Sequence, residues 1–104
     1  MLIVVFCDKE VTAKKVSREI LLSVGDHVNG RTSDKWSRIT IDSKNIVIDM
    51  RKADIERAAG LRPDYVLFYD ASSEFVEYWR YNMGGRYTEL KTLDELIWLV
   101  IKEE

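Results

Sequence analysis

The chain has 104 residues, of which 46% are apolar and 33% are charged, with a formal net charge of −2. This length suits one domain, and the apolar fraction is enough for a hydrophobic core and too large for a disordered chain. The negative charge argues against a protein that coats nucleic acid by bulk electrostatic attraction. No apolar run approaches the roughly 20 residues that span a bilayer, and the N-terminal run is too short for a signal peptide. We therefore expect one cytoplasmic domain over residues 1–104, with no membrane association.

The first half of the chain predicts a strand, a helix and a hairpin. Residues 2–7 are continuously apolar, which is typical of a strand that is buried on both faces of a parallel sheet. Residues 12–24 repeat apolar side chains at helical spacing, with Thr12 as the expected cap. Residues 25–38 are polar and rich in turn formers, which predicts an irregular connection. Isoleucines alternate with other residues on both sides of a turn in 39–50, which predicts a β-hairpin.

The second half predicts a short helix at 53–59, an apolar strand at 65–70 and a helix at 73–82. A short edge strand at 86–90 and a last helix at 92–103 follow, and the Thr92 and Glu95 pair of that helix has the spacing of a capping box. The two apolar strands are expected to be parallel and central. The predicted fold is therefore a single three-layer α/β domain with a central parallel sheet plus a β-hairpin.

Two acidic residues, Asp8 and Asp70, directly follow the two apolar strands. In a parallel α/β sheet the crevice beyond the carboxyl ends of the strands is where ligands bind. If the strands are neighbours, the two carboxylates could hold Mg²⁺, which makes a magnesium-dependent enzyme one alternative. The other interpretation is that both residues cap backbone N–H groups in strand-to-helix turns, and we favour it because a third ligand and a base are missing.

The sequence offers few other reactive groups. Cys7 is the one cysteine, so no intrachain disulfide can form, and its place in an apolar strand predicts a small core side chain. His27 has no partner set that would form a triad or a zinc site. Residues 25–32 match a phosphate-loop pattern with Arg31 in place of lysine, but a helix precedes them instead of a strand. We therefore predict no catalytic residues and no cofactor.

Positive charge is concentrated in residues 31–62, which hold eight Lys and Arg against five Asp and Glu, whereas residues 70–104 hold four against eight. Aromatic and cationic side chains near one another can stack on bases and pair with phosphates. A small nucleic-acid-binding module is therefore an alternative function. Its predicted contacts are Arg31, Lys35, Trp36, Arg38, Arg51 and Lys52.

The C-terminal helix is apolar nearly all round. A stripe of five apolar residues between Leu93 and Ile101 is enough to dock it on a sheet, and Trp98 and Leu99 lie largely off that stripe. Surplus aromatic surface marks a partner site or a self-association site, although Trp98 covering an edge of the core is the alternative. The predicted binding residues are Trp98, Leu99, Tyr78, Trp79 and Tyr81. If the partner is a second copy, Trp98 is expected near a two-fold axis.

Residues 39–48 and 53–70 carry a resemblance to a known family. The segment Gly60-Leu-Arg-Pro-Asp-Tyr65, followed by an apolar strand that ends at Asp70, resembles the ATPase core of phage terminase large subunits and related helicase-like P-loop proteins. In that family such a strand ends in the Walker B acids, and Asp70 matches the first of them. The opening strand and helix are similar to those that follow the phosphate loop in these enzymes.

The departures from that family decide what the resemblance implies. The strand and phosphate loop that would precede Met1 are missing, and Ala71 stands where the catalytic glutamate is expected. A protein without these parts cannot position a γ-phosphate or polarise a water molecule. The resemblance thus implies a helicase-like α/β scaffold without ATPase activity. We expect a non-catalytic binding or regulatory protein of phage or prophage type that acts through a protein–protein surface.

Overall fold

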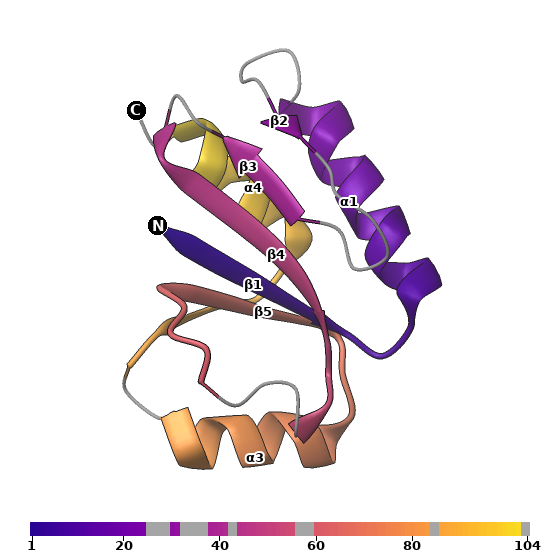
Figure 1. The fold of residues 1–104 in the computed structure, drawn as a ribbon, viewed down its shortest axis with the longest axis vertical. Helices are drawn as coiled ribbons and strands as arrows, with labels where there is room; N and C mark the ends of the chain where they lie inside the picture. The colour runs from indigo at the N-terminus through magenta and orange to yellow at the C-terminus, as the bar shows by residue number, and fades with distance from the viewer. Residues whose placement is uncertain (25–29, 32–37, 42–43, 56–59, 84–85, 103–104) are drawn as a thin grey trace.

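A six-stranded sheet in the order β2-β3-β4-β1-β5-β6 runs through the described part of the chain (Figure 1). The computed structural model describes residues 1–24, 30–31, 38–41, 44–55, 60–83 and 86–102. The strands are β1 (Leu2–Cys7), β2 (Gly30–Arg31), β3 (Arg38–Ile41), β4 (Ile46–Lys52), β5 (Tyr65–Asp70) and β6 (Thr88–Leu90). The helices are α1 (Glu10–Val24), α3 (Ser73–Met83) and α4 (Leu93–Lys102).

The predicted α/β domain with a central parallel sheet is confirmed. Strand β1 pairs in parallel with β4 on one side and with β5 on the other, and β5 pairs in parallel with β6. Strands β3 and β4 pair antiparallel, which is the hairpin expected at 39–50. The edge strand expected at 86–90 is shorter, at Thr88–Leu90, and Gly30–Arg31 adds a strand, β2, inside the connection that was expected to be irregular.

Side-chain caps begin two of the three described helices, α3 and α4. Thr92 Oγ1 accepts the Glu95 N–H at 3.1 Å, as the expected capping box requires, but the Glu95 carboxylate accepts the Lys91 N–H at 3.3 Å, one residue before the expected Thr92 donor. Ser72 Oγ accepts the Phe75 N–H at 3.2 Å and begins α3. Thr12 is not a cap, because α1 already begins at Glu10. The helix expected at 53–59 lies mostly outside the described residues.

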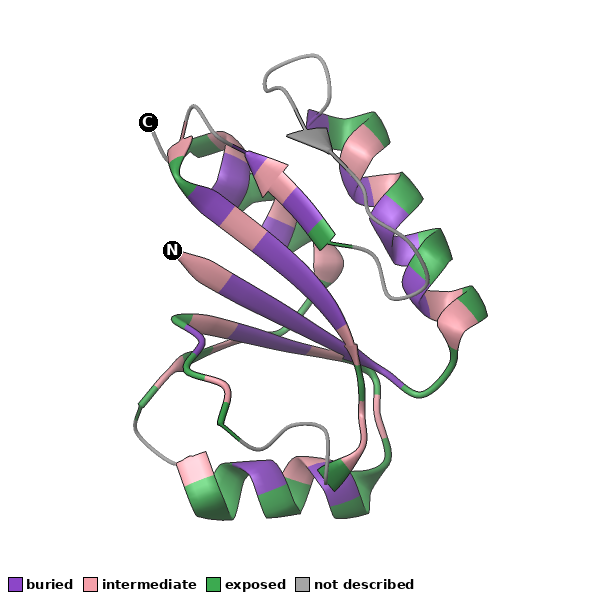
Figure 2. Cartoon of the chain, in the orientation of Figure 1, coloured by how far each residue is buried: buried purple, intermediate pink, exposed green. Residues whose placement is uncertain are grey.

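The two faces of β1 pack against different helices. Successive strand side chains point to opposite faces, so Ile3, Val5 and Cys7 join the core under α1 and α4, whereas Val4 and Phe6 join the core under α3. The whole strand from Ile3 to Cys7 is inaccessible to solvent (Figure 2). Two cores on opposite sides of one sheet make the predicted three layers.

An aromatic cluster fills the core between the sheet and α3. The Phe6 ring lies 4.8 Å from the rings of both Phe75 and Trp79, at interplanar angles of 63° and 61°. Phe68 stacks on Phe6 at 5.8 Å from the neighbouring strand. Edge-to-face pairs of this kind stabilise a core beyond the area that they bury. Phe6 is therefore the centre of this layer.

We predict that Trp79 and Tyr81, two residues apart on α3, contribute very differently to stability. Trp79 is 2% exposed and Tyr81 is 89% exposed. Trp79→Ala should lower the free energy of unfolding by about 3–5 kcal/mol, because it leaves a cavity against Phe6. Tyr81→Ala should change it by less than about 0.5 kcal/mol. Urea denaturation followed by circular dichroism measures both, and equal losses would contradict the packing of α3 described here.

Candidate functional site

The carboxyl ends of β1 and β5 bring Asp8 and Asp70 together. The strands are neighbours, and an irregularity between Phe6 and Cys7 sets Cys7 opposite Asp70. The Asp8 backbone N–H donates to the Asp70 carbonyl at 2.7 Å, and Thr12 Oγ1 donates to Asp70 Oδ2 at 3.4 Å. Thr12 thus fixes the end of β5 against α1. Both carboxylates are exposed to solvent.

The pair of Asp8 and Asp70 is a weak signal for a metal ion. Within the described residues, no group of three His, Cys, Asp or Glu side chains gathers in one place. Mg²⁺ is usually held through one or two protein carboxylates with several waters and substrate phosphates, so a pair alone carries little specificity. The magnesium alternative for Asp8 and Asp70 remains a prediction without a third protein ligand in this part of the chain.

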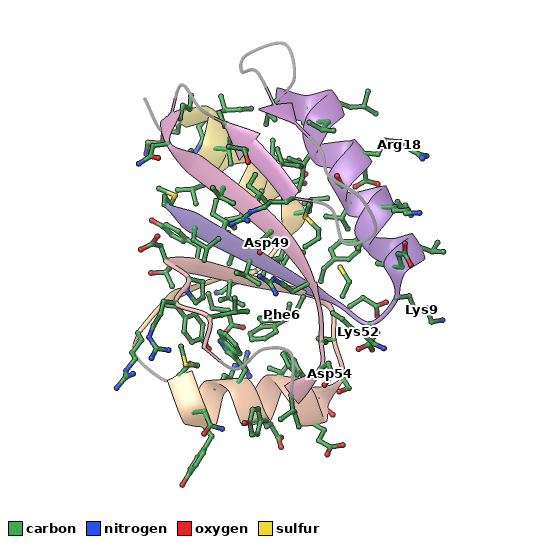
Figure 3. All side chains as sticks on the ribbon, viewed as in Figure 1. Phe6, Lys9, Arg18, Asp49, Lys52 and Asp54 are labelled. Carbon is green, nitrogen blue, oxygen red and sulfur yellow. The ribbon has the colours of Figure 1, made fainter. Side chains whose placement is uncertain are left out.

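A shallow hollow of about 480 Å³ opens beside this edge, between the end of β4 and the start of α3. Lys52, Asp54 and Glu74 line it, so its charge is mixed, and Ser72 already uses its hydroxyl to cap α3. Figure 3 shows Lys9, Lys52 and Asp54 at this end of the sheet. The mixed charge of these described residues does not favour an anion.

Cys7 lies behind this edge and is fully buried. Burial, together with the nearby charges of Asp70 and Asp8, raises the pKa of its thiol from 9.0 to about 12. The thiol therefore stays neutral at physiological pH. A neutral, enclosed thiol is a core side chain rather than a nucleophile, as the sequence predicts for this position.

We predict that Cys7 makes stability fall in alkaline solution. The folded pKa of Cys7 lies above the unfolded one, so the unfolded chain loses this proton first and folding is disfavoured as pH rises from 9.0 toward about 12. Other groups titrate there too, so the measurement is the difference between the native chain and Cys7→Ala in urea unfolding at pH 8 and pH 10.5. Parallel losses in both proteins would contradict the shifted pKa.

The basic residues predicted to contact nucleic acid are divided between faces. Arg38 lies opposite Asp49 in the β3–β4 ladder, and Arg51 follows Asp49 by two positions, so all three share one sheet face. Arg51 Nε donates to Asp49 Oδ2 at 2.9 Å, and Asp49 is nearly buried. This ion pair neutralises the charge of Arg51, so Arg38 is the other cation of the two that the β3–β4 ladder places on this face. Lys52 belongs to the opposite face by strand alternation.

Of the remaining members of that predicted set, Arg31 holds a position in register with this face, because Thr40, its partner in the β2–β3 ladder, lies two positions from Arg38. Lys35 and Trp36 lie outside the described residues, as do His27 and most of the phosphate-loop pattern of residues 25–32. The nucleic-acid alternative therefore rests, within the described chain, on the positions of Arg31 and Arg38 and on an Arg51 that already has a carboxylate partner.

The predicted aromatic surface separates into two parts. Trp79 is removed from the predicted binding residues, because its side chain is buried against Phe6 in the sheet–α3 core. Tyr78 and Tyr81 remain exposed on α3. Figure 1 shows α3 on the other side of the sheet from α4, so the two tyrosines do not extend a patch around Trp98.

Trp98 is 66% exposed on α4, which contradicts the alternative that it covers an edge of the core. Leu96 and Val100 are the fully buried residues of α4, and Trp98 lies nearly opposite them around the helix. Leu99 is half-buried and packs against the core under α1 and α4. Of the predicted binding residues on α4, Trp98 is thus the one that points outward. Leu99 and Trp79 belong to the two cores instead.

Two charged residues beside Trp98 were missed by the sequence analysis. Asp94 and Lys102 are exposed, and each lies four positions from Trp98 on α4. Residues at this spacing lie on one side of a helix. Their spacing of four residues from Trp98 is the signal in the sequence that places them on its side of the helix.

Comparisons of the chain with protein-family models, with curated proteins and with solved structures find no match. The resemblance of residues 39–48 and 53–70 to terminase ATPase cores therefore stays a prediction. Among the described residues, no helix is long and apolar enough to cross a membrane. Function has to be argued from the geometry of the site.

Proposed function

We propose that this chain is a non-catalytic binding protein whose protein-binding surface is the outward side of α4, centred on Trp98. The observation that carries this proposal is the placement of Trp98. Its indole is 66% exposed on the side of the helix that faces away from Leu96 and Val100. Tryptophan is on average largely buried in folded proteins, so an indole that the fold leaves in water calls for another role.

The surroundings of Trp98 fit a protein contact. Ile97 and Ile101 are half-buried and pack against the core under α4, so they border the indole with apolar surface. Tryptophan is enriched among the residues that dominate binding energy, and apolar neighbours help to exclude water from such an anchor. A partner that covers Trp98 would bury one large aromatic side chain together with this apolar border.

The exposed aromatics of α3 are less suited to this role. Tyr78 and Tyr81 carry hydroxyl groups that water can solvate, and Arg80 between them is paired with Glu89 at 2.6 Å. The Arg80 guanidinium also lies 5.9 Å from the centre of the Phe68 ring. Arg80 is thus engaged within the fold, as is common for a long cationic side chain on a solvated surface.

Binding rather than catalysis is supported by the chemistry at the carboxyl ends of the strands. Cys7 has a pKa raised by burial, so no thiolate is available there at neutral pH. Asp70 is engaged by Thr12, and Ser72 caps α3. Nothing in this arrangement pairs a nucleophile with a base.

The first test asks whether position 98 touches a protein in the cell. A photo-crosslinking amino acid, p-benzoylphenylalanine, replaces Trp98 in one variant and Tyr81 in a matched control, both expressed in cells that naturally make the protein. We expect protein adducts from position 98 and few from position 81, because only the first lies on the proposed surface. No adduct at 98, or equal adducts at both positions, would refute the proposed function.

The second test separates binding from folding. Trp98→Ala should change the free energy of unfolding by less than about 1 kcal/mol, because the side chain is mostly in water already. The same change should remove complexes formed through α4, since it deletes their anchor. A loss of stability comparable to that of Trp79→Ala would show that Trp98 serves the core instead.

A further inference from the structure

The outward side of α4 carries a charge pattern that is complementary to its own reversal. Asp94, Trp98 and Lys102 follow one another at intervals of four residues, and all three are exposed. With a rise of 1.5 Å per residue, the acidic and basic residues lie about 6 Å before and after the tryptophan along the helix axis. Trp98 is therefore the midpoint between opposite charges.

The two charges have no partners within the described chain. Neither Asp94 nor Lys102 forms an ion pair or a hydrogen bond with another described residue. On α1, by contrast, Lys14 pairs with Glu10 at 3.4 Å, and on α3 Arg80 pairs with Glu89. The strip on α4 thus combines an exposed anchor with two charges that the described fold does not compensate.

We infer that the partner of the α4 face is a second copy of this chain, packed antiparallel about a two-fold axis that passes beside Trp98. The inference rests on the proposed function, because it names the partner of the same surface. A two-fold axis at Trp98 reverses the strip, so that Asp94 of each copy lies opposite Lys102 of the other. The two Trp98 indoles then meet at the axis and cover each other.

Charge complementarity selects this arrangement over a parallel pair. Parallel helices would set Asp94 against Asp94 and Lys102 against Lys102, and like charges across an interface are unfavourable. Antiparallel packing also opposes the two helix dipoles, which adds a small favourable contribution. The strip is therefore self-complementary in the antiparallel direction alone.

The interface is small, which sets the expected strength of the dimer. One ten-residue helix from each copy buries less than the roughly 1,200–2,000 Å² of a stable complex. We therefore expect a reversible dimer with a dissociation constant of about 1–100 μM. At such an affinity, the loss of a single contact measurably changes the fraction of the chain that is dimeric.

The test reverses the two charges one at a time. Asp94→Lys alone sets two like-charged contacts in the dimer, and Lys102→Asp alone does the same with the opposite sign. Each single variant should raise the dimer dissociation constant at least about tenfold in sedimentation equilibrium at low salt. Mixing the two variants should restore dimers as a heterodimer, because every charge then meets its opposite. Glu103 and Glu104 follow Lys102 and are kept unchanged.

The outcomes distinguish this inference from the proposed function. A native chain that stays monomeric at about 1 mM, a concentration that populates even very weak dimers, or single variants that dimerise like the native chain, would overturn the second copy as partner. Adducts from position 98 with a different protein would then leave the proposed function standing, whereas no adduct would refute both. If a reversed variant fails to fold by circular dichroism, Asp94→Asn and Lys102→Gln replace the pair, and each should weaken the dimer in proportion to the lost attraction.

Discussion

Burial of β1 on both faces is the constraint on which the rest of the structure depends. A strand whose residues from Ile3 to Cys7 are all hidden from water needs a strand on each edge and a helix layer on each face. Strands β4 and β5 supply the edges, α1 with α4 covers one face, and α3 covers the other. Phe6 on one face and Cys7 on the other show why neither layer can be removed without exposing the core.

Much of this arrangement could be predicted from the sequence, because the signals are local. The apolar run at 2–7, the isoleucine alternation at 39–50 and the Thr92–Glu95 cap each specify an element by themselves. The layer on which each helix lies depends on contacts between distant residues. Helical spacing alone therefore predicts that Trp98 lies off the buried stripe of its own helix, but gives no sign that Trp79 faces Phe6 across the sheet.

The candidate sites show the same division between local and distant information. The sequence predicts that Asp8 and Asp70 are close if their strands are neighbours, and the strands are neighbours. It contains no sign that Thr12 would bind Asp70 instead of capping α1, because only the folded sheet brings these two residues near. Asp49 and Arg51 are two positions apart on one strand, so strand alternation alone sets them on one face. Both contacts engage charged groups that the composition alone would leave available.

The ends of α4 explain why this helix is suited to present a strip of side chains. Its first turn is closed by the cap that Thr92, Glu95 and Lys91 form. At its other end Lys44 Nζ donates to the carbonyls of Val100 and Ile101, both at 3.0 Å, which ties the helix to the β3–β4 turn and places a cation at the negative end of the helix dipole. A helix fixed at both ends needs little further ordering when a partner binds, so more of the contact energy appears as affinity. The caps are thus consistent with the proposed binding role of α4, because they fix the backbone that carries Asp94, Trp98 and Lys102.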